Sequence, residues 1–144
     1  MRVPTTPQRS RMMSGIRAKD TWPERSLRSC LFARGFRYRI HVKSLPGSPD
    51  IVLPKYRAVV FVHGCFWHRH KGCRYTTTPK TNSNFWKKKF QGNINRDARH
   101  TQMLVELGWR VAIVWECSLK KSIEKSAGIV EEWLHGDDAK LVVG

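Results

Sequence analysis

The 144-residue sequence predicts an α/β domain with one mixed central sheet flanked by helices. Apolar residues recur at helical spacing in some segments and follow strand patterns in others. These segments follow one another in the order helix, strand, strand, strand, helix, strand, helix. We therefore expect one domain over residues 14–135, a flexible basic N-terminal arm over residues 1–13, and a loose C-terminal tail over residues 136–144.

The first helix is expected from about Trp22 to Arg34 and should end at Gly35. Thr21 and Glu24 have the spacing of a capping box, with a proline in the first turn. Glu24 therefore has two interpretations, since it can pair with the backbone at Thr21 or face Asp50 as a second acidic group.

The next segments carry strand patterns. Apolar and cationic residues alternate over residues 36–40, which predicts a half-buried strand. Two short apolar runs, Asp50–Leu53 and Ala58–Val62, predict a hairpin. No apolar period is visible between Gly64 and about Asn82. A structureless stretch of that length inside a compact domain needs something to fix it in place.

The last third of the chain predicts a helix, a strand and a helix. The helix of this last third begins near Asn82, has Ile94 and Leu104 on its inner face, and has a break at Gly92. A buried strand follows over residues 109–115, and an amphipathic helix runs over residues 123–134.

The formal net charge of +16 and the pI near 10.4 indicate a polyanionic partner, with nucleic acid ahead of a membrane surface. A basic face that is merely hydrated is the alternative. We find no secretory signal and no apolar run of about 20 residues, so a soluble, cytoplasmic protein is expected. Such a compartment is reducing, which favours metal sites or free thiols over disulfides.

Cys65, His70 and Cys73 have a spacing that lets one loop wrap a tetrahedral zinc ion. Cys117, at the end of the predicted buried strand, could complete a Cys3His site. Four protein ligands would make this zinc structural. The alternative is a set of simple buried thiols, which is how we interpret Cys30 on the apolar face of the first helix.

Asp50 begins one strand of the hairpin, and His63 and His68 follow the other. Hydrolysis of a phosphodiester needs an oxygen ligand for Mg2+ and a base for the attacking water. Asp50 can supply the first, and the imidazoles can supply the base and a donor to the transition state.

Phe66 and Trp67 lie in a polar, cationic loop, and Phe85 and Trp86 precede three lysines. Aromatic side chains beside cations suit insertion between base pairs, with the lysines on phosphates. Core packing is the alternative, and we favour it for Phe85.

The segments GSPDIVL, VVFVHGCFWHRHKGC, NFWKKK, NINRD and LGWRVAIVWEC resemble the very short patch repair endonucleases, a family that nicks DNA at T:G mismatches left by deaminated 5-methylcytosine. The resemblance runs from about residue 12 to residue 120. It implies a restriction-endonuclease-like core, a structural zinc and a magnesium-dependent active site.

The resemblance also implies roles for individual residues. The implied catalytic residues are Asp50, His63, His68 and Glu24, and the implied Mg2+ ligands are Asp50 and the backbone carbonyl of Val62, which stands where the family has a threonine. The implied Zn2+ ligands are Cys65, His70, Cys73 and Cys117, with a spacer before Cys73 that is one residue longer than in the family. The expected DNA contacts are Phe66, Trp67, Trp86, Lys87, Lys88, Lys89 and Asn93.

We therefore expect a Mg2+-dependent mismatch endonuclease that nicks one strand beside the thymine of a T:G pair. Its expected partners are mismatched duplex DNA, a DNA cytosine-5 methyltransferase and mismatch-repair proteins, and we expect a monomer associated with the nucleoid of a prokaryotic cytosol. The alternatives are a zinc-stabilised DNA-binding module without hydrolysis and a less selective nickase of the same fold.

Overall fold

The computed structural model describes residues 21–144, so the predicted basic arm over residues 1–13 lies outside the described residues. One sheet has the strand order β1-β2-β3-β4. Its strands are β1 (Ile51–Leu53), β2 (Ala58–His63), β3 (Arg110–Trp115) and β4 (Lys140–Val143). β1 and β2 are antiparallel, whereas β2, β3 and β4 are parallel neighbours. The prediction of an α/β fold with one mixed sheet is thus confirmed.

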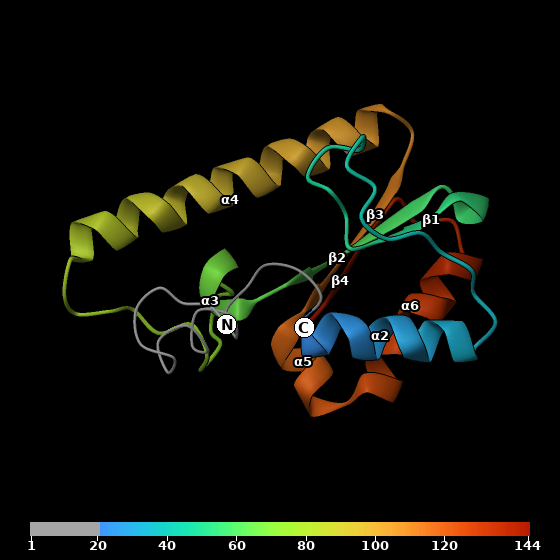
Figure 1. Ribbon diagram of the computed structural model, residues 1–144, viewed down its shortest axis with the longest axis horizontal. Helices are drawn as coiled ribbons and strands as arrows, with labels where there is room; N and C mark the ends of the chain where they lie inside the picture. Colours follow the sequence, from blue (N-terminus) through green and yellow to red (C-terminus); the bar gives the residue numbers. More distant parts are fainter. Residues whose placement is uncertain (1–20) are drawn as a thin grey trace, which may run out of the picture.

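Helices cover both faces of this sheet (Figure 1). On one face, α2 (Trp22–Ala33), α5 (Glu116–Lys121) and α6 (Ile123–His135) pack over the main core. Leu27, Leu31, Val60, Val114 and Leu134 are almost completely buried there. Burying a side chain of this size is worth roughly 1.5–3 kcal/mol, so this layer carries most of the apolar stabilisation.

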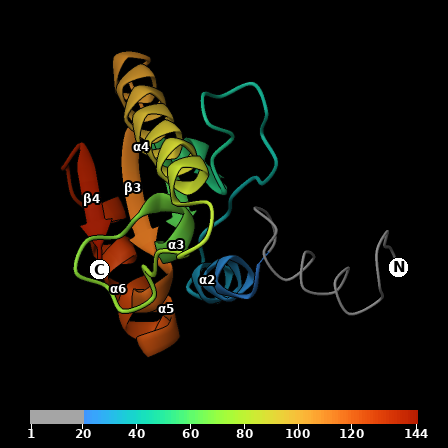
Figure 2. The ribbon, with the colours of Figure 1, turned by 90° about the vertical axis from the view of Figure 1, so that its left-hand side faces the viewer.

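The second face is covered by α4 (Ser83–Glu106), a helix that runs past the end of the sheet (Figures 1 and 2). Only its C-terminal half packs on the strands, where Leu104 joins a smaller core with Phe61 and Val111. Its N-terminal half lies beside the short helix α3 (Cys65–His68), which follows β2 directly. The end of β2 therefore emerges between α2 and α4.

Several predicted elements are confirmed. The first helix ends at Ala33 and the last helix ends at His135. The predicted hairpin is present, with Ile51 opposite Val60, and its connection is a 3-10 helix, η1 (Pro54–Tyr56). The buried strand before the last two helices is β3.

The strand predicted over residues 36–40 was wrong. This segment forms one isolated bridge, in which Arg39 and Val52 exchange two backbone hydrogen bonds. His41 then takes a positive φ of 58°, which turns the chain away from the sheet before a ladder can form.

The prediction of a loose C-terminal tail was also wrong for residues 140–143, because β4 pairs with β3 and buries Val143. A four-residue strand is too short for the alternation of apolar and polar residues to be recognised in the sequence. The predicted break at Gly92 is absent, since α4 is continuous through it. One glycine costs a helix only about 1 kcal/mol relative to alanine, and a long helix absorbs that cost.

The helices of residues 21–144 all lack the combination of length and apolarity that crossing a membrane would require.

Candidate active site and metal centre

An acid pair lies where α2 meets the hairpin. Asp50 precedes β1, and its Oδ2 accepts a 2.6 Å hydrogen bond from the backbone N–H of Val62 at the end of β2. Glu24 on α2 is only 3% exposed. Burial and, next, the negative charge of Glu24 raise the pKa of Asp50 well above its usual value. A buried carboxyl group beside a second, partly buried one forms a place that favours a cation.

This geometry bears on the two interpretations of Glu24. The side chain of Thr21 makes no capping hydrogen bond at the start of α2. Glu24 acts on Asp50 through both charge and a side-chain hydrogen bond. Glu24 and Asp50 therefore lie together, as the interpretation of Glu24 as a second acidic group expects.

Two imidazoles stack beyond the end of β2. The rings of His63 and His68 lie 3.9 Å apart and nearly parallel, at 5°. His68 Nδ1 lies 2.5 Å from Asp97 Oδ2 on α4. If Nδ1 carries the proton that Asp97 accepts, Nε2 of His68 is the atom that can take another proton.

His63 is the more buried imidazole. Burial, followed by the charge of His68, lowers the pKa of His63 to about 3, so this ring stays neutral near pH 7. Its Nδ1 is buried and has no hydrogen-bond partner within residues 21–144. An unpartnered buried nitrogen is costly, which makes it available to a group that the protein alone does not supply.

Four further side chains converge on the other side of α3. The ligand atoms of Cys65, His70, Cys73 and Cys117 all lie within 4.8 Å of one another. His70 Nδ1 is 3.7 Å from Cys65 Sγ and 3.4 Å from Cys117 Sγ. A tetrahedral zinc ion with Zn–S near 2.3 Å and Zn–N near 2.0 Å separates nitrogen and sulfur by about 3.5 Å. This Cys/His cluster can therefore hold a tetrahedral metal ion.

The topology explains how the distant Cys117 reaches this cluster. His63 and Trp115 are partners at the carboxyl ends of β2 and β3. Cys65 and Cys117 each follow their strand by two residues, so the parallel pairing brings the two thiols to the same edge of the sheet. Trp115 also stacks on the His70 ring at 4.2 Å. Without an ion, burial raises the pKa of the Cys65 thiol to about 12.

An aromatic cluster joins α3 to the N-terminal half of α4. The ring of Phe66 lies 5.0 Å from Trp67 and 5.8 Å from Trp86, and Phe90 lies beneath them at 6% exposure. Trp67 and Trp86 remain partly exposed. Phe85, which we expected in the core, is 60% exposed.

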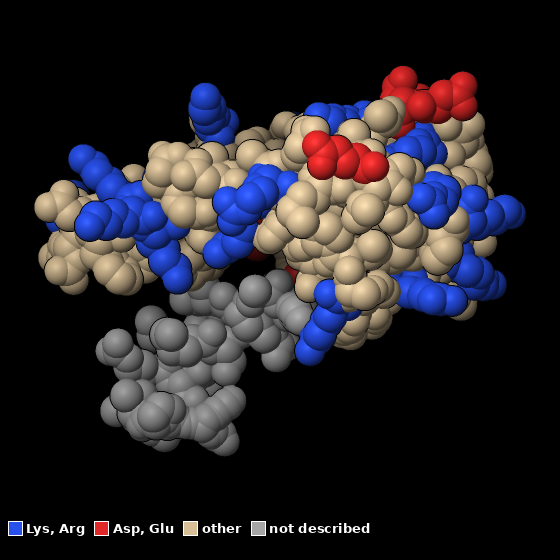
Figure 3. Space-filling model, turned by 90° about the horizontal axis from the view of Figure 1, so that it is seen from above, with Lys and Arg blue, Asp and Glu red and all other residues tan. Residues whose placement is uncertain are grey.

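Cations extend from this cluster along α4. Lys87, Lys88 and Lys89 are exposed beside the aromatic residues. Arg96 and Arg99 continue the basic surface toward the sheet. The view from above shows Lys and Arg side chains along this face of the molecule, with few acidic ones (Figure 3). A surface of this charge suits a phosphate backbone.

Comparison with known proteins bears on this site directly. The family model described as DNA mismatch endonuclease Vsr matches residues 1–74. The DNA mismatch endonuclease Vsr of Escherichia coli (strain K12) is 44% identical over 139 residues, which cover 94% of this chain and 88% of that protein. The chain belongs to the Vsr family of DNA mismatch endonucleases. It is therefore an endodeoxyribonuclease.

Two further relatives carry a different description. The type II nicking enzyme V.XorIIP of Xanthomonas oryzae pv. oryzae is 50% identical over 79% of this chain and 84% of its own length. The type II nicking enzyme V.NaeI of Lentzea aerocolonigenes is 36% identical over 92% of this chain and 80% of its own length. The relatives of this chain thus include a protein described as a mismatch endonuclease and proteins described as nicking enzymes.

The structure places the site residues expected from the sequence in three groups around the end of β2. Asp50, Glu24 and Val62 form one, His63 and His68 the second, and the Cys/His cluster the third. Asn93 differs from the other expected DNA contacts, because it is 6% exposed and its Nδ2 donates a 3.1 Å hydrogen bond to the carbonyl of Trp67.

Our sequence reasoning missed Asp97 as a site residue. A signal was available, since Asp97 is one of only five carboxylates before residue 116 and lies in the NINRD segment. The contact with His68 spans 29 residues along the chain. Only the packing of α4 over α3 brings the two side chains together.

Proposed function

We propose that this chain nicks one strand of duplex DNA beside the thymine of a T:G mismatch that arises from deaminated 5-methylcytosine, by Mg2+-dependent phosphodiester hydrolysis. The observation that carries the proposal is the arrangement around the end of β2, where the carboxyl pair and the His68–Asp97 pair flank Val62 and His63. An acid pair for an ion and a carboxylate-oriented base are the two parts that such hydrolysis requires.

Asp50, Glu24 and the backbone carbonyl of Val62 would hold the Mg2+. The donor set fits, because Mg2+ prefers carboxylate and carbonyl oxygens and two desolvated carboxyl groups need positive charge. The replacement of a threonine by Val62 leaves a backbone carbonyl unchanged. When bound, the ion supplies a Lewis acid that stabilises charge on the phosphoryl oxygens.

His68 acts as the general base in this proposal. Its Nε2 accepts a proton from the attacking water, and Asp97 holds the ring and stabilises the imidazolium that forms. His63, neutral and stacked on His68, can donate one N–H to the transferred phosphate or to the leaving oxygen.

Cys65, His70, Cys73 and Cys117 would hold a structural Zn2+. Four protein ligands leave no open position for a substrate, so the ion fixes α3 and its loop rather than activating water. The tetrahedral spacing of the ligand atoms supports His70, not His68, as the imidazole ligand.

Phe66, Trp67 and Trp86 are the proposed mismatch wedge. A T:G pair stacks less well than a matched pair, so insertion beside it costs less unstacking energy, on the order of a few kcal/mol per step. Lys87, Lys88 and Lys89 would contact phosphates. Asn93, which holds the carbonyl of Trp67, supports the wedge.

The same proposal covers the remaining expectations. The core is restriction-endonuclease-like, supported by one mixed sheet with its acid residue at the start of the β1–β2 hairpin. Residues 14–135 with β4 form the catalytic domain, and residues 1–13 act as a basic arm on DNA. The enzyme works as a monomer in a prokaryotic cytosol, at the nucleoid, in the same repair route as a cytosine-5 methyltransferase and mismatch-repair proteins.

A less selective nickase is the second candidate, favoured by the relatives described as type II nicking enzymes. The test is nicking of end-labelled duplexes that carry each mismatch in varied flanking sequences, with Mg2+ present or chelated. We expect a cut on the thymine strand of T:G duplexes only when Mg2+ is present. Equal cutting of all mismatches would favour the second candidate, and binding without cutting would contradict hydrolysis.

A further inference from the structure

A buried arginine accompanies the acid pair. Arg28 lies one helical turn after Glu24 on α2, so the two side chains share one face of the helix. Arg28 is only 8% exposed, and its backbone carbonyl accepts a 3.1 Å hydrogen bond from the hydroxyl of Tyr38. Arginine is almost never buried without groups that balance its charge.

Arg28 and the two carboxyl groups line the same small cavity. Its volume is about 10 Å3, and its walls are Glu24, Arg28, His41, Ser48, Pro49 and Asp50. A cavity of this size has room for about one water molecule. Arg28 therefore shares the lining of one small cavity with both carboxyl groups.

Arg28 brings a fixed positive charge to the wall that it shares with Glu24 and Asp50. A buried guanidinium beside two carboxyl groups stabilises negative charge on them. A divalent ion bound by the same carboxyl groups would be repelled by this fixed cation, since like charges in a poorly solvated site interact strongly.

We propose that Arg28 is a positioning residue, a counter-ion built into α2 that holds the Glu24–Asp50 pair together before the divalent ion binds and weakens the affinity of the pair for that ion. The inference rests on the proposed function only in taking Asp50 and Glu24 as the ion-binding groups. It predicts that the site is organised without its ion and binds it reversibly.

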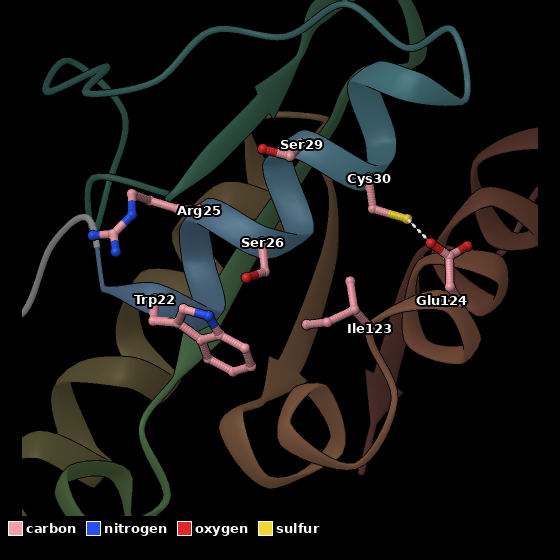
Figure 4. Close-up of a pocket in the computed structure, with 7 residues that line it drawn as sticks. All are labelled: Trp22, Arg25, Ser26, Ser29, Cys30, Ile123 and Glu124. Atoms are coloured by element: carbon pink, nitrogen blue, oxygen red, sulfur yellow. Dashed lines mark hydrogen bonds between the residues drawn. The ribbon is translucent and has the colours of Figure 1, made fainter.

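Arg25 offers a matched control on the same helix. It is exposed and lines a different cavity of about 440 Å3, together with Trp22, Cys30 and Glu124 (Figure 4). Removing its charge changes the net charge of the protein by the same amount as removing that of Arg28. Its effect on the acid pair should be small, because Arg25 is exposed and does not line the cavity of the acid pair.

The test is Mn2+ binding, measured by electron paramagnetic resonance on the full-length, zinc-loaded protein. Mn2+ substitutes for Mg2+ at oxygen sites, and binding that is lost in Asp50→Asn identifies the acid site. We expect Arg28→Met and Arg28→Gln to bind Mn2+ roughly tenfold more tightly than the wild type, because a repelling charge is gone. Arg28→Lys and Arg25→Met should stay within about twofold.

A second measurement checks the organising role. Without Mn2+, Arg28→Met should melt at a lower temperature than Arg25→Met, and Mn2+ should restore more of its stability than it adds to the wild type. If Arg28→Met does not fold, Arg28→Gln provides the same comparison.

The outcomes separate this inference from the proposed function. Unchanged or weaker Mn2+ binding in both neutral variants would overturn the role of Arg28 while leaving the acid site intact. Tighter binding in Arg28→Lys, equal to that in Arg28→Met, would also overturn it, since the charge is retained there. Absence of any Asp50-dependent Mn2+ binding in the wild type would contradict the proposed function instead.

Discussion

The two candidate ion sites flank the same short segment after β2, yet they differ in how their charges are balanced. The Cys/His cluster brings four ligand atoms within 4.8 Å, and burial raises the pKa of its Cys65 thiol. The acid site places the N–H of Val62 and the side chain of Arg28 beside its carboxyl groups. We expect the first site to be completed by its ion and the second to be partly organised before its ion binds. Removing the metal ion should therefore lower the stability of the fold at the Cys/His cluster. At the acid site, removing the ion should abolish catalysis.

The largest expected effect tests the acid site. Asp50→Asn should reduce nicking of a T:G duplex by about a thousandfold or more, because the ion stabilises transition-state charge by several kcal/mol. The protein should still fold, since an amide oxygen can still accept the hydrogen bond from the N–H of Val62. Binding to the duplex, measured by gel shift, should stay within a few-fold. Retained Mg2+-dependent nicking would contradict the catalytic assignment.

The second prediction tests the opposite behaviour at the Cys/His cluster. Cys117→Ser should lose zinc and lower the melting temperature by roughly 10 °C or more, because a structural zinc ion contributes directly to folding. Cys30→Ser is the control, since Cys30 lies on α2 with only a weak contact to Glu124. Zinc content by elemental analysis and melting by circular dichroism provide the readouts. A zinc-free wild type whose melting is indifferent to a strong chelator would rule out the site.

A smaller effect should separate the base from the ion within the active site. Asp97→Asn removes the carboxylate that orients His68 but leaves Asp50, Glu24 and Val62 unchanged. We expect the single-turnover nicking rate to fall about 10–100-fold, as is typical when a supporting partner of an active-site histidine is lost. Glu106→Gln, an exposed change on the same helix, is the control. Equal rates in both variants would mean that Asp97 does not orient the base.

The positions of several site residues at strand ends could be predicted from the sequence, whereas the contacts between distant residues could not. Contiguous apolar runs begin or end at or near Asp50, His63 and Cys65. The end of such a run predicts the end of a strand without any tertiary information. The meeting of Cys65 with Cys117 needs the parallel pairing of β2 with β3, which no local pattern encodes.

The contacts of Asp97 and Arg28 were beyond local patterns for the same reason. A charged residue on a helix is normally solvated, but the packing of α4 on α3 pairs Asp97 with His68, and the packing around α2 buries Arg28. Apolar pattern also misled us on α4, where Ile94 is 41% exposed and the polar Asn93 is buried. That part of the helix packs on α3 rather than on the sheet.

The smallest expected effect concerns the aromatic cluster. Trp67→Ala should reduce the preference for T:G over matched duplex by about tenfold, because the wedge gains most where unstacking is cheap. Phosphate contacts should keep the affinity for matched DNA nearly unchanged. Phe85→Ala is the control, since Phe85 is 60% exposed and lies beside Trp86. An unchanged preference together with a lower melting temperature would assign Trp67 to the fold instead of to recognition.

The compactness of the segment after β2 limits how this enzyme can change. Residues 63–68 contain both imidazoles, one thiol of the Cys/His cluster and two aromatic residues. An insertion or deletion there would displace all of these groups in one step. The spacer between His70 and Cys73 is different, because Gly72 takes a φ of 72° and has open space around it. Length variation among relatives is therefore expected to collect in that spacer, and a library made to retarget the enzyme should keep residues 63–68 at fixed length and place its substitutions on α4.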